Sequence, residues 1–131
     1  MSFSAQISQY SKGTRDKIDR IRRGVTLKLL GAVVMDTPVL KGTLRGNWRV
    51  SEGTPVLDAI DRVDPSGAIV MSEITAAVQA STGDAAVYLT NNLPYAKRIE
   101  YDGWSHIKAP EGMVRRNLAR FNQLIKVEVT K

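Results

Sequence analysis

The sequence predicts an α+β fold in which a small antiparallel sheet packs with a long N-terminal helix, a middle helix and a C-terminal helix. At both ends of the chain and once in the middle, apolar residues recur every three or four positions, which is the period of an α-helix. Two short stretches between these helices alternate apolar and polar residues, as half-buried strands do. The sequence shows no repeat and no low-complexity linker, so we expect residues 1–131 to form one domain. Residues 1–13 could extend from it as an N-terminal arm.

The first expected helix covers residues 4–35. Its stripe consists of Ile7, Tyr10, Ile18, Ile21, Val25, Leu29 and Ala32. Gly13 weakens a helix by about 1 kcal/mol relative to alanine and could divide this one in two. A helix of this length exceeds the width of a small domain, so part of the stripe could meet another protein chain. The alternative is a core helix with a frayed start, and Pro38 ends the helix in either case.

The next segments are expected to form a loop and the first strand. Residues 40–46 predict the loop, and residues 47–51 predict a strand with Trp48 and Val50 facing inward. Residues 52–63 suit either a second strand or an irregular packed segment.

The middle helix is expected over residues 66–80, with Asp64 as its N-cap and Pro65 in its first turn. Its buried face would be formed by Val70, Ile74, Ala77 and Val78. A strand over residues 85–91 follows and ends at two asparagines that can bond their own backbone in a turn.

Pro94 then starts a short helix that Gly103 stops. The residues expected to make apolar contact are Tyr95, Ala96, Ile99 and Tyr101, and those expected to face outward are Lys97, Arg98 and Glu100. The last helix begins at Pro110, with Glu111 placed favourably at its N-terminus. Its stripe is Val114, Leu118, Phe121 and Ile125. Residues 127–130 alternate like a strand, so the helix could fray there or the end could join the sheet.

Charge is spread unevenly along the chain, whose formal net charge is +6. Basic residues gather over residues 12–28 and 108–131, whereas residues 58–84 are neutral to acidic. This pattern suits a nucleic-acid surface, an interface with an acidic protein, or solvated helix faces. The chain has no cysteine, no apolar run of the ~20 residues that a membrane helix needs, and no signal-peptide pattern at its start. We therefore expect a protein made in a reducing cytoplasm, with no membrane partner.

No set of catalytic residues can be assembled from the sequence. His106 is the only histidine, and without cysteine it cannot build a His/Cys zinc site, so we expect it to be a surface or packed residue. No Gly-x-Ser-x-Gly turn exposes a nucleophile, and the Gly42–Gly46 loop lacks the Gly-Lys-Ser/Thr ending of a phosphate loop. The sequence predicts a protein that is not an enzyme and has no cofactor or metal.

One ordered set of residues resembles a known family. It comprises YLTNNLPYA at 88–96, IEY at 99–101 with Gly103 and Trp104, AP at 109–110 and GMVR at 112–115, preceded by DTPV at 36–39, Gly42, Leu44 with Arg45, and NW at 47–48. Together these residues cover roughly half the chain. They resemble the tail-completion or head–tail joining proteins of long-tailed, lambdoid bacteriophages, the lambda protein Z-like minor tail components. The family usually has a glycine directly after Ile-Glu-Tyr, where this chain has Asp102, which would make that turn one residue longer.

The resemblance implies a structural virion protein of the phage neck, made in the bacterial host cytoplasm. Such proteins form rings around the DNA channel, which implies a homo-hexamer whose partners are head connector or stopper proteins and the tail terminator or tail tube protein. The interface candidates are Arg45, Trp48, Tyr95, Tyr101, Trp104, Met113 and Arg115. Arg22 and Arg23 are candidates for facing the lumen or channel DNA. The alternative is a small basic DNA-binding or packaging accessory protein, whose helices would neutralise phosphates.

Overall fold

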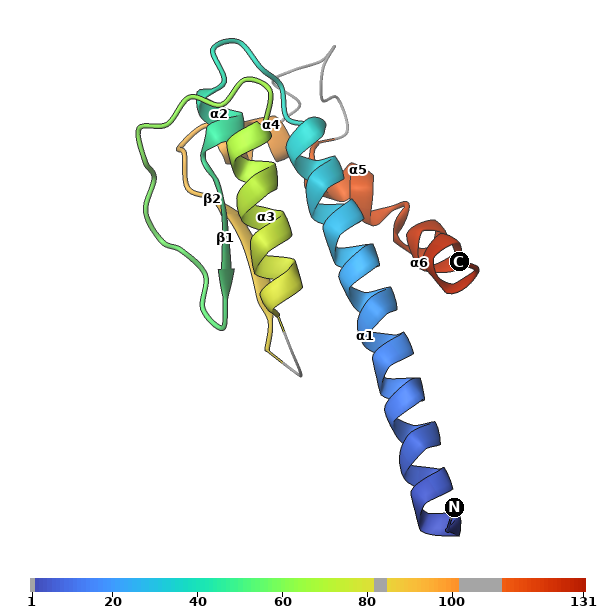
Figure 1. Cartoon of the computed structure of the whole chain (residues 1–131). Coiled ribbons are helices and arrows are strands. Elements are labelled where there is room, and N and C mark those ends of the chain that lie inside the picture. Colours follow the sequence, from blue (N-terminus) through green and yellow to red (C-terminus); the bar gives the residue numbers. More distant parts are fainter. Residues whose placement is uncertain (1, 82–84, 102–111) are drawn as a thin grey trace.

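The computed structural model of the chain describes residues 2–81, 85–101 and 112–131 (Figure 1). Its elements follow in the order α1 (Phe3–Met35), α2 (Thr43–Gly46), β1 (Trp48–Glu52), α3 (Ala68–Ala80), β2 (Val87–Asn91), α4 (Ala96–Tyr101), α5 (Val114–Leu118) and α6 (Phe121–Val129). The fold is α+β, as the sequence predicts, with a two-stranded antiparallel sheet and helices at both ends and in the middle of the chain. No helix of the described part of the chain is both long enough and apolar enough to cross a membrane.

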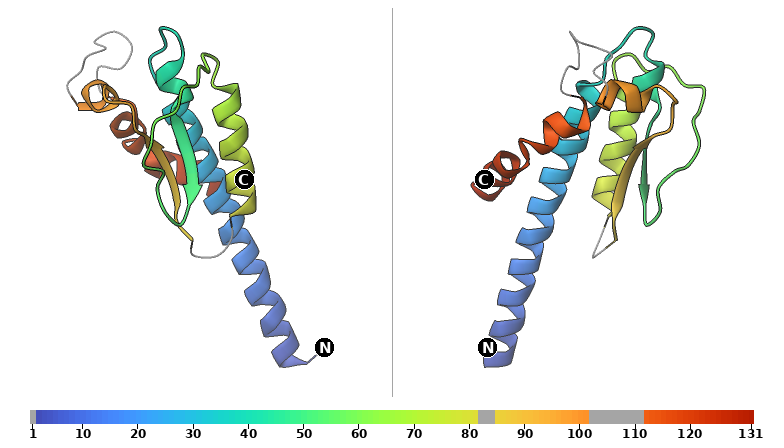
Figure 2. Two further views of the ribbon diagram at one scale, coloured as in Figure 1. Left: turned by 90° about the vertical axis from the view of Figure 1, so that its left-hand side faces the viewer. Right: turned by 180° about the vertical axis from the view of Figure 1, so that it is seen from behind.

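Helix α1 runs without interruption for 33 residues. The hydroxyl of Ser2 accepts a hydrogen bond from the backbone N–H of Ala5 at 3.2 Å and so caps its start. Gly13 does not divide the helix, so that expectation was wrong. The N-terminal half of α1 extends well past the rest of the molecule, whereas its C-terminal half lies against the body (Figures 1 and 2).

The two strands pair in register from Trp48 opposite Asn91 to Glu52 opposite Val87. A two-stranded sheet is only marginally stable alone and needs a hydrophobic cover. Helix α3 packs on the sheet, α1 packs on α3, and α5 and α6 lie on the far side of α1 (Figure 2). The molecule is therefore layered in the order sheet, α3, α1 and the C-terminal helices.

The core lies where the C-terminal half of α1, α3 and the sheet meet. Its buried apolar members are Val33, Val34, Leu44, Trp48, Val70, Ile74, Val78, Ala96, Ile99 and Met113. Val50 packs against this cluster, so the inward side of the first strand was predicted correctly. The stripe expected for the middle helix is confirmed at Val70, Ile74 and Val78, which are buried.

Two local expectations before α3 need correction. The predicted loop at residues 40–46 contains the short helix α2, which follows Gly42 in the left-handed region at φ 99°. Helix α3 begins at Ala68 rather than at 66, because Gly67 has a φ of 77° and interrupts the helical backbone. Asp64 is therefore not the N-cap residue, yet its carboxylate still accepts the N–H of Val70 at 2.9 Å. Residues 53–63 form no strand, so the irregular alternative holds.

The C-terminal helix is two helices rather than one. Helix α5 ends at Leu118 and α6 starts at Phe121, so the expected continuous stripe is broken and both of these side chains are exposed. Residues 127–129 belong to α6 and residue 130 is its C-cap, so the end of the chain does not join the sheet. Gly103, Pro110 and Glu111, which were expected to bound helices, lie outside the described residues.

Candidate interaction site

The projecting end of α1 carries exposed apolar side chains on one side. We call residues 3–20 the α1 tip. Its exposed apolar residues are Phe3, Ile7, Tyr10 and Ile18, and the side chains of Phe3 and Tyr10 are 76% and 78% exposed. Steps of three, four and, across Thr14, eight residues join these positions to Ile21 and to the buried Val25, so they share one face of the helix from the tip into the body. The tip is also basic, with Lys12, Arg15, Lys17 and Arg20 against Asp16 and Asp19.

The two arginines that follow the tip are directed at the chain itself. Arg22 donates from Nη2 to the hydroxyl of Ser81 at 3.0 Å, and Arg23 donates from Nη2 to the Ser81 carbonyl at 3.3 Å. Ser81 is the C-cap of α3, where helix carbonyls lack helical partners. These arginines join α1 to the end of α3, which differs from the expectation that they face a lumen or DNA.

Arg45 has the same kind of internal role. Its guanidinium donates to the carbonyl of Pro65 at 2.7 Å and to the carbonyls of Met35 and Thr37, both at 2.9 Å. Arginine suits such a position because its planar group offers several donors in a fixed arrangement. Arg45 therefore fastens the end of α1 to the turn before α3, and both of its terminal nitrogens, Nη1 and Nη2, donate to carbonyls of the chain.

Two other interface candidates belong to the core. Trp48 is 4% exposed and Met113 is 1% exposed. The indole N–H of Trp48 donates to the hydroxyl of Thr37 at 2.7 Å, and that hydroxyl donates to the carbonyl of Val33 at 2.8 Å. Neither side chain offers a partner much surface, and Trp48 serves instead to fix the C-terminal end of α1 against β1.

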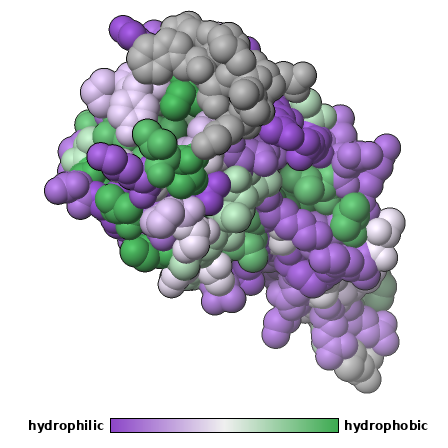
Figure 3. Space-filling view, turned by 90° about the horizontal axis from the view of Figure 1, so that it is seen from above, coloured by the Kyte–Doolittle hydropathy of each residue, from purple (hydrophilic) through white to green (hydrophobic). Residues whose placement is uncertain are grey.

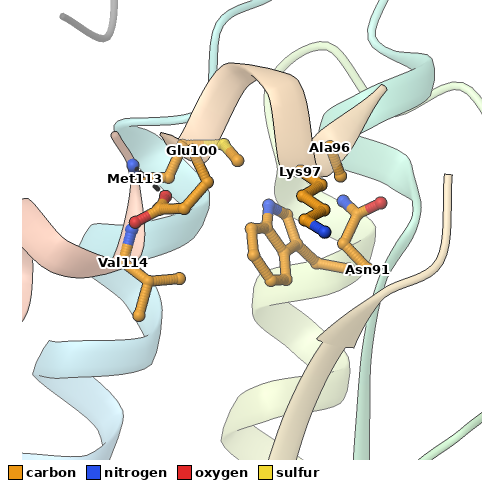
Figure 4. Close-up of a pocket in the computed structure, with 7 residues that line it drawn as sticks. Asn91, Ala96, Lys97, Glu100, Met113 and Val114 are labelled. Carbon is orange, nitrogen blue, oxygen red and sulfur yellow. Dashed lines mark hydrogen bonds between the residues drawn. The ribbon is translucent and has the colours of Figure 1, made fainter. Parts of the chain in front are cut away.

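Glu100 is the polar residue whose position differs most from expectation. It was expected to face outward from α4, but it is only 6% exposed. Its carboxylate accepts hydrogen bonds from the backbone N–H groups of Met113 and Val114 at 2.5 and 2.9 Å (Figure 4). It also accepts one from the backbone N–H of Arg115 at 2.8 Å. These are N–H groups at the start of α5, which have no partner within that helix. Glu100 thus caps α5 from a different helix.

The surroundings of Glu100 act on its pKa in opposite directions. Burial raises the pKa, but the hydrogen bonds from the backbone N–H groups of Arg115, Val114 and Met113 and from the Arg115 side chain lower it more. The net result is a pKa below the ordinary value for glutamate, because these donors favour the charged form. The Arg115 guanidinium also donates to the Glu100 carbonyl, so the two residues are joined by both side chain and backbone.

The remaining interface candidates lie around α4. Tyr101 is exposed, and the Arg115 guanidinium lies 5.2 Å from the centre of its ring, a cation–π contact. Tyr95 is half-buried and packs against the core. Trp104 lies outside the described residues, as does His106. The structure therefore brings the exposed Tyr101 and Arg115 together, while Trp48 is buried.

A hollow of about 210 Å³ lies beside this cluster (Figure 4). Its lining consists of Trp48, Asn91, Ala96, Lys97, Glu100, Met113 and Val114. The Glu100 carboxylate is engaged by the start of α5, and the Asn91 amide donates to the carbonyl of Leu44 at 2.8 Å. The described residues contain no group of three or more His, Cys, Asp or Glu side chains that could hold a metal ion.

A second buried carboxylate attaches α6 to α1. Glu128 lies 2.6 Å from Nζ of Lys28 and 3.0 Å from Nζ of Lys131. The Glu128 carboxylate also lies directly against α1 at Gly24, where an added Cβ would be only 2.3 Å from Glu128 Oε2. Hydrogen bonding between these groups raises the pKa of Lys28 and lowers that of Glu128. Sequence reasoning missed this contact, since the spacing of Gly24 and Glu128 carries no local signal.

Residues 52–63 form the opposite side of the molecule from α6 (Figures 1 and 2). We call them the acidic segment. Leu57 is 85% exposed there, and Glu52, Asp58 and Asp61 are also exposed. The backbone of the segment is held in place, because the Asn92 amide donates to the carbonyl of Val56 at 2.9 Å.

Other exposed apolar residues are scattered. The face seen in Figure 3 shows apolar side chains in separate groups within hydrophilic surface. Such dispersed residues are normal for a protein surface. The α1 tip and the acidic segment each combine exposed apolar residues with charges mainly of one sign, positive on the tip and negative on the segment. Comparisons with protein-family models, curated proteins and solved structures found no match for this chain.

Proposed function

We propose that this chain is a structural protein of a bacteriophage neck, which completes the tail and joins it to the DNA-filled head. In this proposal it forms a homo-hexameric ring around the DNA channel, between the head connector or stopper proteins and the tail terminator or tail tube protein. The resemblance of residues 36–48 and 88–115 to tail-completion proteins supports the phage assignment.

The structural observation that best supports the proposal is the exposed apolar face of the α1 tip. Its apolar stripe extends beyond the body of the molecule and is exposed at Phe3, Ile7, Tyr10 and Ile18. In proteins most of the stability of a helix comes from packing its apolar face, and the apolar face of the tip is not packed within this chain. A helix presented this way is typical of a surface that a protein partner covers. In a ring of identical subunits, each subunit provides a neighbour with a surface that covers its tip.

The test is electron microscopy of lysates from a phage whose copy of this gene carries a nonsense codon. We expect DNA-filled heads and tails of finished length that are not joined. The matched control is the same phage with the gene supplied from a plasmid, which should restore complete particles. Intact particles without the protein, or empty heads alone, would refute the neck assignment.

A second candidate is a DNA-binding or packaging accessory protein, which the exposed charges of the tip favour. Lys12, Arg15, Lys17 and Arg20 form no salt bridge with any described residue. If all four contacted phosphates, the logarithm of duplex affinity would fall with the logarithm of salt concentration with a slope of about −3.6. A slope of this size, combined with normal particles from the nonsense phage, would favour this second function.

A further inference from the structure

We infer that the α1 tip of one copy docks on the acidic segment of a neighbouring copy, so that identical subunits join head to tail. This inference rests on the proposed function and adds the partner surface that the tip recognises. It is drawn from the charge and apolar exposure of two surfaces on the same chain.

In the described part of the chain outside α1, exposed carboxylates without a salt bridge are concentrated in the acidic segment. Among the described residues outside α1, the exposed carboxylates that form no salt bridge are Glu52, Asp58 and Asp61, and all three belong to the acidic segment. The cation within that segment, Arg62, is bonded to Glu73 at 2.9 Å and to the Gly46 carbonyl at 2.7 Å. The segment therefore presents net negative charge, while the tip presents net positive charge.

Both surfaces also expose apolar side chains. On the segment these are Leu57 and Val63, and on the tip they include Phe3 and Tyr10. Protein interfaces typically combine buried aromatic or aliphatic residues with charged groups at the rim. Opposite charges around apolar centres would fix which two surfaces meet and in which register.

The tip of one molecule cannot reach the acidic segment of the same molecule. The tip projects from the N-terminal end of α1, while the segment lies beyond the sheet, on the other side of α3 from α1 (Figures 1 and 2). Because α1 is one uninterrupted helix, the tip cannot fold back to that side. Contact between two tips would bring like charges together. Of the described surfaces of this chain, the segment of another copy is the one whose charge complements the tip, and such a contact between different patches builds rings when its rotation closes.

Disulfide cross-linking tests this contact directly, because the chain has no cysteine of its own. One variant carries Tyr10→Cys and a second carries Leu57→Cys. When the two are mixed and oxidised, we expect a cross-linked heterodimer. The matched control replaces Tyr10→Cys with Asp16→Cys, an exposed position away from the apolar stripe of the tip. A yield no higher than that of the control would overturn the inference.

Charge exchange gives an independent test by sedimentation. The pair Lys12→Glu and Arg15→Glu, or the pair Asp58→Lys and Asp61→Lys, should each weaken self-association by about tenfold. A mixture of the two variants should recover association, because each then meets a complementary surface. If the tip variant loses duplex DNA binding while self-association is unchanged, the tip binds nucleic acid and the inference fails.

The two proposals can fail separately. Unjoined heads and tails from the nonsense phage, together with no specific cross-link, would keep the neck role and reject this docking contact. A specific cross-link together with intact nonsense particles would keep the contact and reject the neck role.

Discussion

The cap that Glu100 places on α5 can be tested by the single substitution Glu100→Gln. The two side chains have nearly the same size, so the change leaves packing intact while it removes the negative charge, which pairs with Arg115, and one hydrogen-bond acceptor oxygen. One carboxylate oxygen accepts from the N–H groups of Met113 and Val114, and the other accepts from the N–H and Nε of Arg115. Glutamine has only one oxygen that can accept these bonds. Its NH₂ group would face N–H donors, from which it cannot accept a hydrogen bond.

The magnitude follows from the donors that lose their acceptor. A buried donor left without an acceptor costs about 1–3 kcal/mol, and hydrogen bonds to a charged group are the stronger kind. With two donors affected, we expect the free energy of unfolding to fall by about 3 kcal/mol. For a domain of this size that corresponds to a decrease in Tm of about 10 °C.

Urea and thermal unfolding followed by circular dichroism measure this change. The matched control is Lys97→Gln, on the same short helix but exposed, which should change the free energy of unfolding by less than about 0.5 kcal/mol. If Glu100→Gln were as stable as the control, the capping role argued for Glu100 would be incorrect.

The pH dependence gives a second check. Because the folded-state pKa of Glu100 is below its ordinary value, its stabilisation is complete above the unfolded pKa of about 4.3. It is lost as pH falls through the lower folded-state pKa. The stability difference between the wild-type protein and Glu100→Gln should therefore be constant near neutral pH and shrink below about pH 4. A difference that grew on acidification would contradict this sign.

Three further substitutions test other parts of the fold. Gly112→Ala should destabilise the protein by about 2 kcal/mol or more in urea unfolding, because Gly112 has a φ of 83° and its Cβ would lie 2.7 Å from a backbone carbonyl oxygen of α4. Trp48→Phe should cost about 1–3 kcal/mol in the same assay, because it removes the hydrogen bond to Thr37 along with some core volume; an unchanged midpoint would argue against that bond. Gly13→Ala should stabilise the tip by about 1 kcal/mol, seen as slower amide exchange there, because a Cβ at this position meets nothing within 4 Å.

The helices and strands were predictable where their signal is local. Period alone located α1 and α3, and alternation located β1 with Trp48 and Val50 inward. The start of α3 was misplaced by two residues, because Gly67 with its positive φ is the N-cap and Asp64, further upstream, accepts the N–H of Val70 without being the N-cap. The division between α5 and α6 has no proline or glycine to announce it in the sequence.

The side-chain roles were less predictable, because their partners lie far away in sequence. A glutamate in a short helix is expected to face water, and only the return of the chain 13 residues later gives Glu100 its donors. Arg22, Arg23 and Arg45 were expected to serve partners or DNA, yet each is bonded to groups of its own chain. Charge counted along the sequence does not distinguish these internal arginines from the exposed ones of the tip.

The hydrogen bonds and ion pairs of these internal residues also bear on the geometry of the proposed ring. The internal arginines and the Lys28–Glu128 pair fasten α1 to α3 and α6, so the direction of α1 relative to the body is fixed. The tip continues that direction as part of the same helix. If the tip binds the acidic segment of the next copy, the angle between α1 and the sheet sets the rotation between neighbours. The number of subunits that closes the ring would then depend on contacts within one subunit, as well as on the interface itself.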